Sequence, residues 1–229
     1  VLYSFEDVGM TLRLSKCSFG KSHVKYIGHD IGSGTRSPLQ NKVETIKAIP
    51  EPHNKKLLRS FLGSMAFYRA YIPRYSELAL PLTELTKRDV PNKIRFNDEQ
   101  RSAFLKLKQS LCDSVKLFSP DPSREYIIRT DASNTCVAGC LSQIDCDGIE
   151  RPIAFMSTKL SGAQLNWSTI ERESFAVVQA LQKFDYLVFG RKIKLFCDHN
   201  PITFLTACAP NSAKLTRWAL SMSRYDLTV

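Results

Sequence analysis

Several common sequence features are missing from these 229 residues. No apolar run approaches the roughly 18 residues that a membrane-spanning helix needs. The first residues have neither the basic start nor the apolar core of a signal peptide, and internal repeats and low-complexity segments are absent. The seven cysteines are odd in number, scattered and without the paired spacing of a zinc site. These absences favour an intracellular globular protein with reduced thiols that is neither secreted nor membrane-bound.

The chain is strongly basic. It carries 32 Lys and Arg against 22 Asp and Glu, a formal net charge of +10. Basic residues outnumber acidic ones by 20 to 12 in residues 1–123 and by only 12 to 10 in residues 124–229. Each Lys or Arg placed on a phosphate releases condensed counterions, so this surplus favours a polyanionic partner such as a nucleic acid. A basic composition that serves solubility alone remains an alternative.

Residues 24–31 form an apolar and aromatic run typical of one β-strand, ended by a turn at Gly32-Ser33-Gly34. The glycine pattern is not that of a dinucleotide loop, because Ser37 stands in place of the third glycine and Pro38 follows. Residues 39–88 have a helical pattern divided by prolines, which indicates a small bundle. We expect its helices at residues 40–49, 54–71 and 76–85, followed by another helix at residues 97–111.

From residue 123 the pattern changes to strands, and the order of elements predicts an α/β layer with a mixed sheet. Two helices should begin with capping boxes, Asn97 with Gln100 and Ser168 with Glu171. We expect strands at residues 125–130, 137–143, 151–157 and 192–197, a turn at 145–148, helices at 169–184, 201–207 and 212–221, and a last strand that starts at Tyr225.

Three acidic residues stand where such a sheet could gather them. Asp131 ends the first of these strands, Asp198 ends the fourth, and Glu173 lies in the first turns of the helix between them. If the two strands are neighbours, their ends place the two aspartates side by side. Clustered carboxylates repel one another and persist mainly where a divalent cation neutralises them, and an all-oxygen ligand set selects Mg²⁺ or Mn²⁺. Three solvated acids without a metal are the alternative.

Motifs in both halves of the chain follow the order used by one protein family. In the second half they are Thr130-Asp131-Ala132-Ser133, Gly139-Cys140-Leu141-Ser142-Gln143, Pro152-Ile153-Ala154-Phe155, Asn166-Trp167-Ser168-Thr169 leading to Glu173, and Cys197-Asp198-His199. In the first half they are Leu14-Ser15-Lys16-Cys17, Tyr26-Ile27-Gly28-His29, Leu58-Arg59-Ser60-Phe61-Leu62-Gly63, Phe67-Tyr68-Arg69 and Ala79-Leu80-Pro81-Leu82. Together they resemble the reverse transcriptase and ribonuclease H region of Ty3/gypsy-type retrotransposon Pol polyproteins.

This resemblance covers nearly the whole chain and implies an α/β protein in which a small helical thumb bundle precedes a ribonuclease H-like mixed five-stranded sheet with helices. It assigns residues 1–36 to the end of the polymerase palm with a primer-grip-like hairpin, 37–90 to the thumb, 91–123 to a connection segment and 124–229 to a truncated ribonuclease H-like domain. The polymerase centre of the family needs a Tyr-x-Asp-Asp hairpin. No Asp-Asp pair occurs here, so we expect the polymerase active site upstream of this chain.

Carried over residue by residue, the resemblance makes Asp131, Glu173 and Asp198 the catalytic metal ligands of the ribonuclease H centre. Glu173 is preferred to Glu171 because the family's ligand stands three residues before the small residue that matches Ala176. The expected cofactor is Mg²⁺ or Mn²⁺, as two ions. The resemblance places the family's fourth acid beyond the end of this sequence.

The expected helix at residues 54–71 has two contrasting faces. One is apolar and should be buried, and it contains Leu57, Leu58, Phe61, Leu62, Met65 and Tyr68. The family uses the other, basic face to follow the template–primer duplex, and it uses the hairpin to grip the primer end. A solvated charged face is the alternative. The expected nucleic-acid-binding residues are Tyr26, Gly28, His29, Lys56, Arg59, Gly63, Phe67 and Arg69.

The resemblance thus implies part of a reverse transcriptase that hydrolyses the RNA strand of RNA–DNA hybrids and supports RNA-directed DNA synthesis. The expected partners are the hybrid, the template–primer duplex and the rest of the Pol polyprotein, in a cytoplasmic particle or the nucleus. Because the fourth acid is expected outside the sequence, a second hypothesis stays open. It is a catalytically inactive remnant that acts as a nucleic-acid-binding or structural module.

Overall fold

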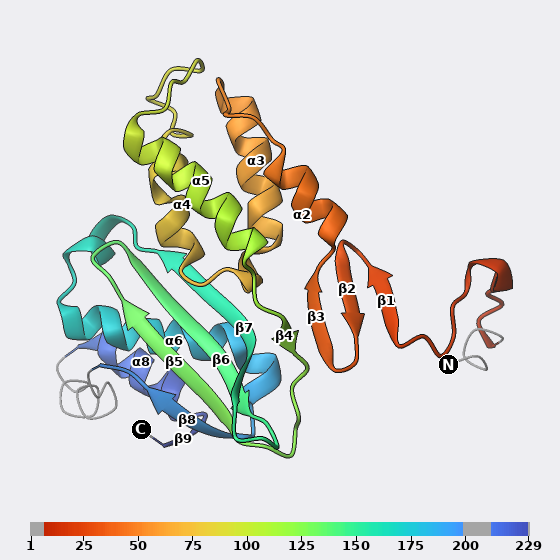
Figure 1. The fold of residues 1–229 in the computed structure, drawn as a ribbon. Helices are drawn as coiled ribbons and strands as arrows, with labels where there is room; N and C mark the ends of the chain where they lie inside the picture. The colour runs from red at the N-terminus through yellow and green to blue at the C-terminus, as the bar shows by residue number, and fades with distance from the viewer. Residues whose placement is uncertain (1–6, 199–211, 229) are drawn as a thin grey trace.

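The computed structural model describes residues 7–198 and 212–228. They form a helical bundle and a small antiparallel sheet, which come mainly from the first half of the chain, and a larger mixed sheet from the second half (Figure 1). None of the helices in these residues is long and apolar enough to cross a bilayer. The helix expected at residues 201–207 lies outside the described residues.

The small sheet has four strands in the order β1-β2-β3-β4, all antiparallel. The expectation of a single strand over residues 24–31 is wrong, because the chain turns back at Ile27-Gly28 and forms a hairpin. Both turn residues have positive φ, 41° and 78°, as a two-residue hairpin turn of the primed type requires. Ile27 hid this turn, since a β-branched residue favours strands. The strands are β1 (His23–Tyr26), β2 (His29–Gly32), β3 (Thr35–Pro38) and β4 (Leu117–Phe118), and a short 3₁₀ helix, η1 (Leu14–Lys16), precedes them.

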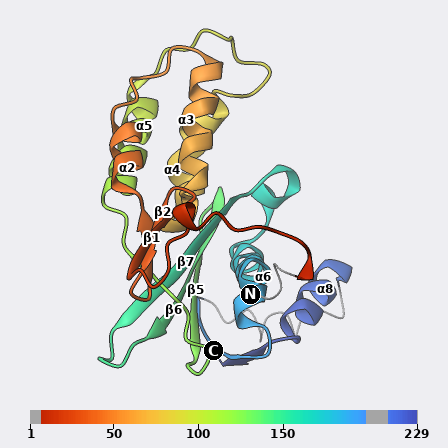
Figure 2. The same ribbon diagram turned by 90° about the vertical axis from the view of Figure 1, so that its right-hand side faces the viewer.

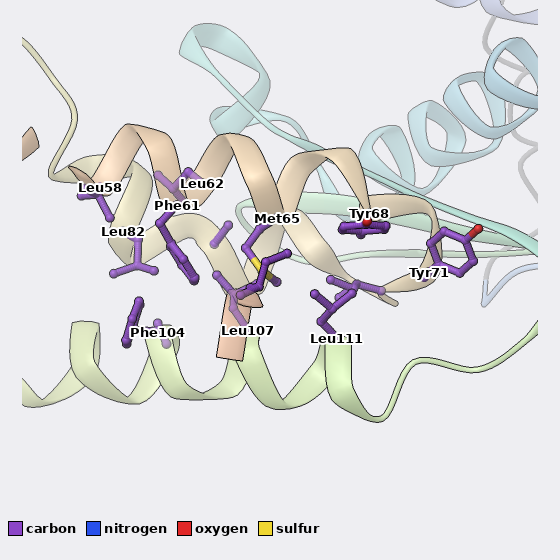
Figure 3. Packing of buried hydrophobic residues seen from close by; sticks show 14 of the residues in the cluster. Leu58, Phe61, Leu62, Met65, Tyr68, Tyr71, Leu82, Phe104, Leu107 and Leu111 are labelled. Atoms are coloured by element: carbon purple, nitrogen blue, oxygen red, sulfur yellow. The ribbon is translucent and has the colours of Figure 1, made fainter. Parts of the chain in front are cut away.

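Four helices surround one hydrophobic core (Figure 3). Leu58, Phe61 and Met65 project from α3 toward Phe104 and Leu107 of α5, and the rings of Phe61 and Phe104 lie 4.6 Å apart. Because α5 belongs to this same core, the expected boundary between thumb and connection at residue 90 is not visible in the packing, and the domain limits stay a prediction. The helices are α2 (Gln40–Lys47), α3 (Lys55–Phe67), α4 (Tyr75–Glu84) and α5 (Asp98–Cys112).

Two details of α3 differ from expectation. The helix ends at Phe67 and a separate 3₁₀ helix, η2 (Arg69–Tyr71), follows, whereas the sequence predicted one helix as far as residue 71. Leu57, expected in the core, has 42% of its surface exposed because it lies in the first turn at the edge of the apolar face. The other five apolar residues of that face are buried as predicted.

The larger sheet has five strands in the order β7-β6-β5-β8-β9. Strand β6 pairs antiparallel with both β5 and β7, whereas β5 pairs with β8, and β8 with β9, in parallel. The predicted fold class, a helical bundle followed by a mixed five-stranded sheet with helices, is therefore confirmed. The strands are β5 (Tyr126–Ala132), β6 (Cys136–Ile144), β7 (Glu150–Lys159), β8 (Lys192–Phe196) and β9 (Asp226–Thr228).

Within the described residues, two helices pack on this sheet. The long helix α6 (Thr169–Val188) runs across β5 and β6, and α8 (Ala213–Met222) lies beside it (Figure 2). A short 3₁₀ helix, η3 (Gly162–Asn166), precedes α6. The predicted capping boxes are both present, at Asn97 with Gln100 and at Ser168 with Glu171. The second one fixes where α6 begins, and with it the position of every side chain in the first turns of that helix.

The bundle touches the larger sheet along the edge strand β7. Ser157 on β7 accepts a hydrogen bond from the backbone N–H of Ser76 at 2.8 Å, and its hydroxyl donates to the Ser76 hydroxyl at 3.0 Å. Toward the other end of α4, Lys159 pairs with Glu84. This polar seam holds α4 against β7.

Candidate metal centre and nucleic-acid interface

Asp131 and Asp198 are brought together by the parallel pairing of β5 and β8. In that pairing Arg129 lies opposite Phe196, so the residues that follow in both strands run in the same direction. They lead to one edge of the sheet, the edge formed by the C-terminal ends of these two strands. Asp131 is the second residue after Arg129, and Asp198 is the second residue after Phe196. The neighbouring strands that the sequence argument required are thus present.

Glu173 reaches the same edge from α6. The capping box commits the Glu171 carboxylate to the N-terminus of the helix, and this carboxylate also pairs with Lys214 of α8. Glu173 is two residues further along and points the other way, with only 3% of its surface exposed. Asp131, Glu173 and Asp198 each offer a carboxylate oxygen, and these oxygens lie within 4.8 Å of one another.

This donor set fits a hard divalent cation. Its three members are all carboxylates, which Mg²⁺ and Mn²⁺ prefer, and their burial runs from exposed Asp198 through half-buried Asp131 to buried Glu173. Burial, and then the charges of Glu173 and Asp198, raise the pKa of the neighbouring Cys197 thiol to about 11. The carboxylate oxygens of the three acids would hold the expected ion or ions.

Sequence reasoning missed one residue at this cluster. Arg74, between η2 and α4, forms an ion pair with Asp131, which is 57 positions away in the sequence. Its backbone is left-handed, with φ 51° and ψ 32°, a conformation that costs a non-glycine residue about 1–3 kcal/mol. In the sequence, Pro73 before it marks only the end of a helix. Nothing in the spacing of the residues links this loop of the bundle to the acids at the edge of a distant sheet.

The expected basic face of α3 is exposed along most of its length. Lys56, Arg59 and Gly63 are all exposed, and the space above Gly63 is open, so a duplex backbone could approach closely. Arg59 donates a hydrogen bond to the Thr86 carbonyl oxygen at 2.9 Å, which fixes its direction across the surface. Phe67, at the end of the helix, has 50% of its surface exposed. These residues form one continuous row.

The hairpin residues meet the end of this row. The His29 ring stacks on Phe67 with centroids 5.1 Å apart, and Tyr68 donates a hydrogen bond to the Gly28 carbonyl oxygen at 3.0 Å. Burial, and then the charge of Arg36, lowers the pKa of His29 below its ordinary value. Gly28, His29 and Phe67 therefore form one cluster, whereas Tyr26 lies on the outer strand with 59% of its surface exposed.

Arg69, the last of the expected nucleic-acid-binding residues, faces a different feature. It lines a groove of about 380 Å³ between the end of the bundle and the larger sheet, together with Ser157 of β7 and Gln182 and Lys183 of α6. Two cations and an amide on opposite walls could hold phosphate oxygens. The groove extends the basic row of α3 from the bundle onto the larger sheet.

Comparison with known proteins bears on this arrangement. Residues 121–225 match the model of the RNase H-like domain found in reverse transcriptase. The matched region contains all three clustered acids, and Arg74, which pairs with one of them, lies outside it.

The region upstream of the RNase H-like domain has relatives as well. The whole chain is 34% identical over 230 residues to the Retrovirus-related Pol polyprotein from transposon 297 of Drosophila melanogaster. It is 31% identical over 233 residues to the Transposon Tf2-3 polyprotein of Schizosaccharomyces pombe. The match covers 21% and 17% of those proteins, so the chain spans about a fifth of their length. The resemblance to retrotransposon Pol polyproteins, predicted from the motifs, is confirmed.

Solved structures share the fold of the RNase H-like domain and of the bundle before it. A foamy viral protease-reverse transcriptase in complex with RNA/DNA hybrid superposes on 94% of this chain and 30% of that one, with a TM-score of 0.78 at 22% identity. The same kind of protein in complex with dsDNA gives a TM-score of 0.75 at 23% identity, over 94% of this chain and 46% of that one. The superposition therefore covers both halves of the chain and establishes their fold.

Proposed function

We propose that this chain is the part of a retrotransposon reverse transcriptase that hydrolyses the RNA strand of RNA–DNA hybrids. The observation that carries the proposal is the convergence of Asp131, Glu173 and Asp198, whose carboxylate oxygens lie within 4.8 Å of one another in an RNase H-like domain. Carboxylates this close repel one another unless a cation lies between them. The similar foamy viral protease-reverse transcriptase in complex with RNA/DNA hybrid supports the choice of substrate class.

Each residue of the cluster has a distinct part in this proposal. Two divalent ions, when bound, supply an activated water and stabilise the leaving 3′ oxygen of the phosphodiester. Buried Glu173 would fix the inner side of the site, while Asp131 and exposed Asp198 would hold the ions at the edge where a hybrid backbone can reach them. Helix α6 positions Glu173, because the capping box at Ser168 fixes where this helix begins.

The bundle and hairpin would hold the duplex in this proposal. Lys56, Arg59, Gly63 and Phe67 offer a row of exposed cations, an open glycine and an aromatic ring, which suits contacts with a nucleic-acid backbone. Support for RNA-directed DNA synthesis, assembly with the rest of a Pol polyprotein and an intracellular location, in particle or nucleus, belong to the same proposal. The domain limits at residues 36, 90 and 123 are part of it too.

The test is cleavage of end-labelled RNA annealed to DNA, with Mg²⁺ or Mn²⁺, by the wild-type chain and by Asp131→Asn. Asp98→Asn is the matched control, because it removes the same charge from a fully exposed carboxylate on α5. Cleavage by the wild type and the control, lost in Asp131→Asn, is the expected result. Salt-sensitive hybrid binding without any cleavage by the wild type would contradict the proposal and favour the inactive remnant.

A further inference from the structure

The ion pair between Arg74 and Asp131 joins the bundle to the candidate metal centre. Asp131 belongs to the RNase H-like domain, whereas Arg74 lies upstream of it, just before α4. The guanidinium contacts the Oδ2 atom of a carboxylate that is also within 4.8 Å of two other acids. One carboxylate is therefore shared between a cation of the bundle and the proposed metal ligand set.

Arg74 is held in this place by its surroundings and not by its own preference. Its left-handed backbone is unfavourable for a residue with a side chain, and such conformations persist only where neighbouring contacts enforce them. Those contacts are the hydrogen bonds between Ser76 and Ser157, two residues further on, and the pair between Glu84 and Lys159. Docking of α4 on β7 thus brings Arg74 to Asp131.

A second acceptor for the same guanidinium lies next to Asp131. The Nε atom of Arg74 is 3.4 Å from Oε2 of Glu77, one turn into α4, and the two carboxylates line the same small pocket with Ser133. Arg74 can therefore leave Asp131 and keep a partner on its own helix. Both pairs are about half exposed, so exchanging one for the other requires little desolvation.

We propose that Arg74 competes with a metal ion for the Asp131 carboxylate. In the metal-free centre Arg74 is the counter-ion of Asp131, and when a divalent cation binds, its guanidinium moves to Glu77. A guanidinium and a metal ion both neutralise the carboxylate and both need its lone pairs, so one displaces the other. Metal binding at the three acids then depends on how α4 is docked on β7. This inference rests on the proposed function, because it requires a metal at Asp131.

The first test is Mn²⁺ binding, measured by electron paramagnetic resonance of the free ion, for the wild-type chain and Arg74→Ala. Arg88→Ala is the control, since it removes the same charge from an exposed residue beyond the end of α4. We expect Arg74→Ala to lower the Kd about two- to five-fold, the range that a half-exposed ion pair allows, and the control to leave it unchanged. The difference should shrink at high salt, because exposed pairs are screened.

The second test follows the arginine itself. The Nε–H resonance of Arg74, assigned through its absence in Arg74→Ala, should shift when Mg²⁺ saturates the wild-type chain and should stay in place in Asp131→Asn. An unchanged resonance in the Mg²⁺-saturated wild type, or equal or weaker Mn²⁺ binding by Arg74→Ala, would overturn the competitor role while leaving the metal centre intact. If the wild type and Arg74→Ala bind Mn²⁺ no better than Asp131→Asn, the proposed metal centre itself is wrong.

Discussion

The Tyr71 hydroxyl lies 2.9 Å from Nδ1 of His29 and so joins the end of the bundle to the hairpin of the small sheet. The imidazole is also stacked on Phe67. Burial lowers the pKa of His29, and the charge of Arg36 lowers it further. The packing that links bundle and hairpin therefore favours the neutral form of this histidine.

This link should weaken in acid. The folded pKa of His29 lies below the ordinary 6.5, so its contribution to stability is complete above pH 6.5 and is lost as pH falls through the folded pKa. We expect the free energy of unfolding to fall less between pH 6.5 and about pH 5 in His29→Gln than in the wild type. Urea denaturation at both pH values measures this. His53→Gln, at an exposed histidine, should keep the wild-type pH dependence, and a matching change in both variants would contradict the assignment.

The hairpin turn should not accept a side chain at Gly28. Its φ is 78°, and a Cβ there would lie 2.9 Å from the Tyr68 hydroxyl oxygen and 3.2 Å from the Phe67 ring. We expect Gly28→Ala to cost about 1–3 kcal/mol of stability. Gly34→Ala is the matched control, because Gly34 has a similar φ of 69° but open space around it. Equal losses in the two variants would mean that the close approach to Tyr68 has no energetic weight.

Arg59 should contribute to duplex binding through a phosphate. We expect Arg59→Ala to weaken binding to every hybrid sequence alike and to reduce the slope of log K against log salt by about 0.9, the value for one phosphate contact. Fluorescence anisotropy at several salt concentrations measures both. Arg217→Ala removes an exposed arginine on α8 that, like Arg59, donates a hydrogen bond to a backbone carbonyl oxygen, and it should leave the slope unchanged. An unchanged slope in Arg59→Ala would mean that this face of α3 is simply solvated.

The assignment of Glu173, and not Glu171, as a metal ligand can be tested without an activity assay. Saturating Mg²⁺ should raise the Tm of the wild type, since a ligand at 100 times its Kd adds about 2.7 kcal/mol to stability. Glu173→Gln should lose this metal-dependent rise. Glu171→Gln should lower the Tm of the metal-free protein modestly, because it removes the charge that pairs with Lys214 while the glutamine can still complete the capping box, and it should retain the rise. The reverse pattern would exchange the two roles.

Most of the fold follows from local patterns that act over a few residues. Asn97 with Gln100 and Ser168 with Glu171 mark the starts of α5 and α6 because a capping box satisfies two backbone donors at once. The expectation that Asp131 and Asp198 meet needed only the assumption that their strands are neighbours, and β5 and β8 are. Family motifs supplied the choice of Glu173, which the structure buries beside them.

What the sequence did not predict depends on contacts between distant segments. The turn at Ile27-Gly28 is enforced by pairing of β1 with β2, against the strand preference of isoleucine. β4 has only two residues and is recognisable solely through its pairing with β3. The contact of Arg74 with Asp131 has no counterpart in any local pattern, because it results from the docking of α4 on β7.

The parallel pairing of β5 with β8 also has a consequence for folding kinetics. Parallel neighbours need a crossover, here through the whole of α6, and closing such a long loop comes before any of its contacts are gained. Antiparallel β5, β6 and β7 can form earlier from short connections. Two of the three clustered acids, Glu173 and Asp198, come from the crossover and its far end. The proposed metal centre should therefore be among the last features to assemble when the chain refolds, after the first three strands have already paired.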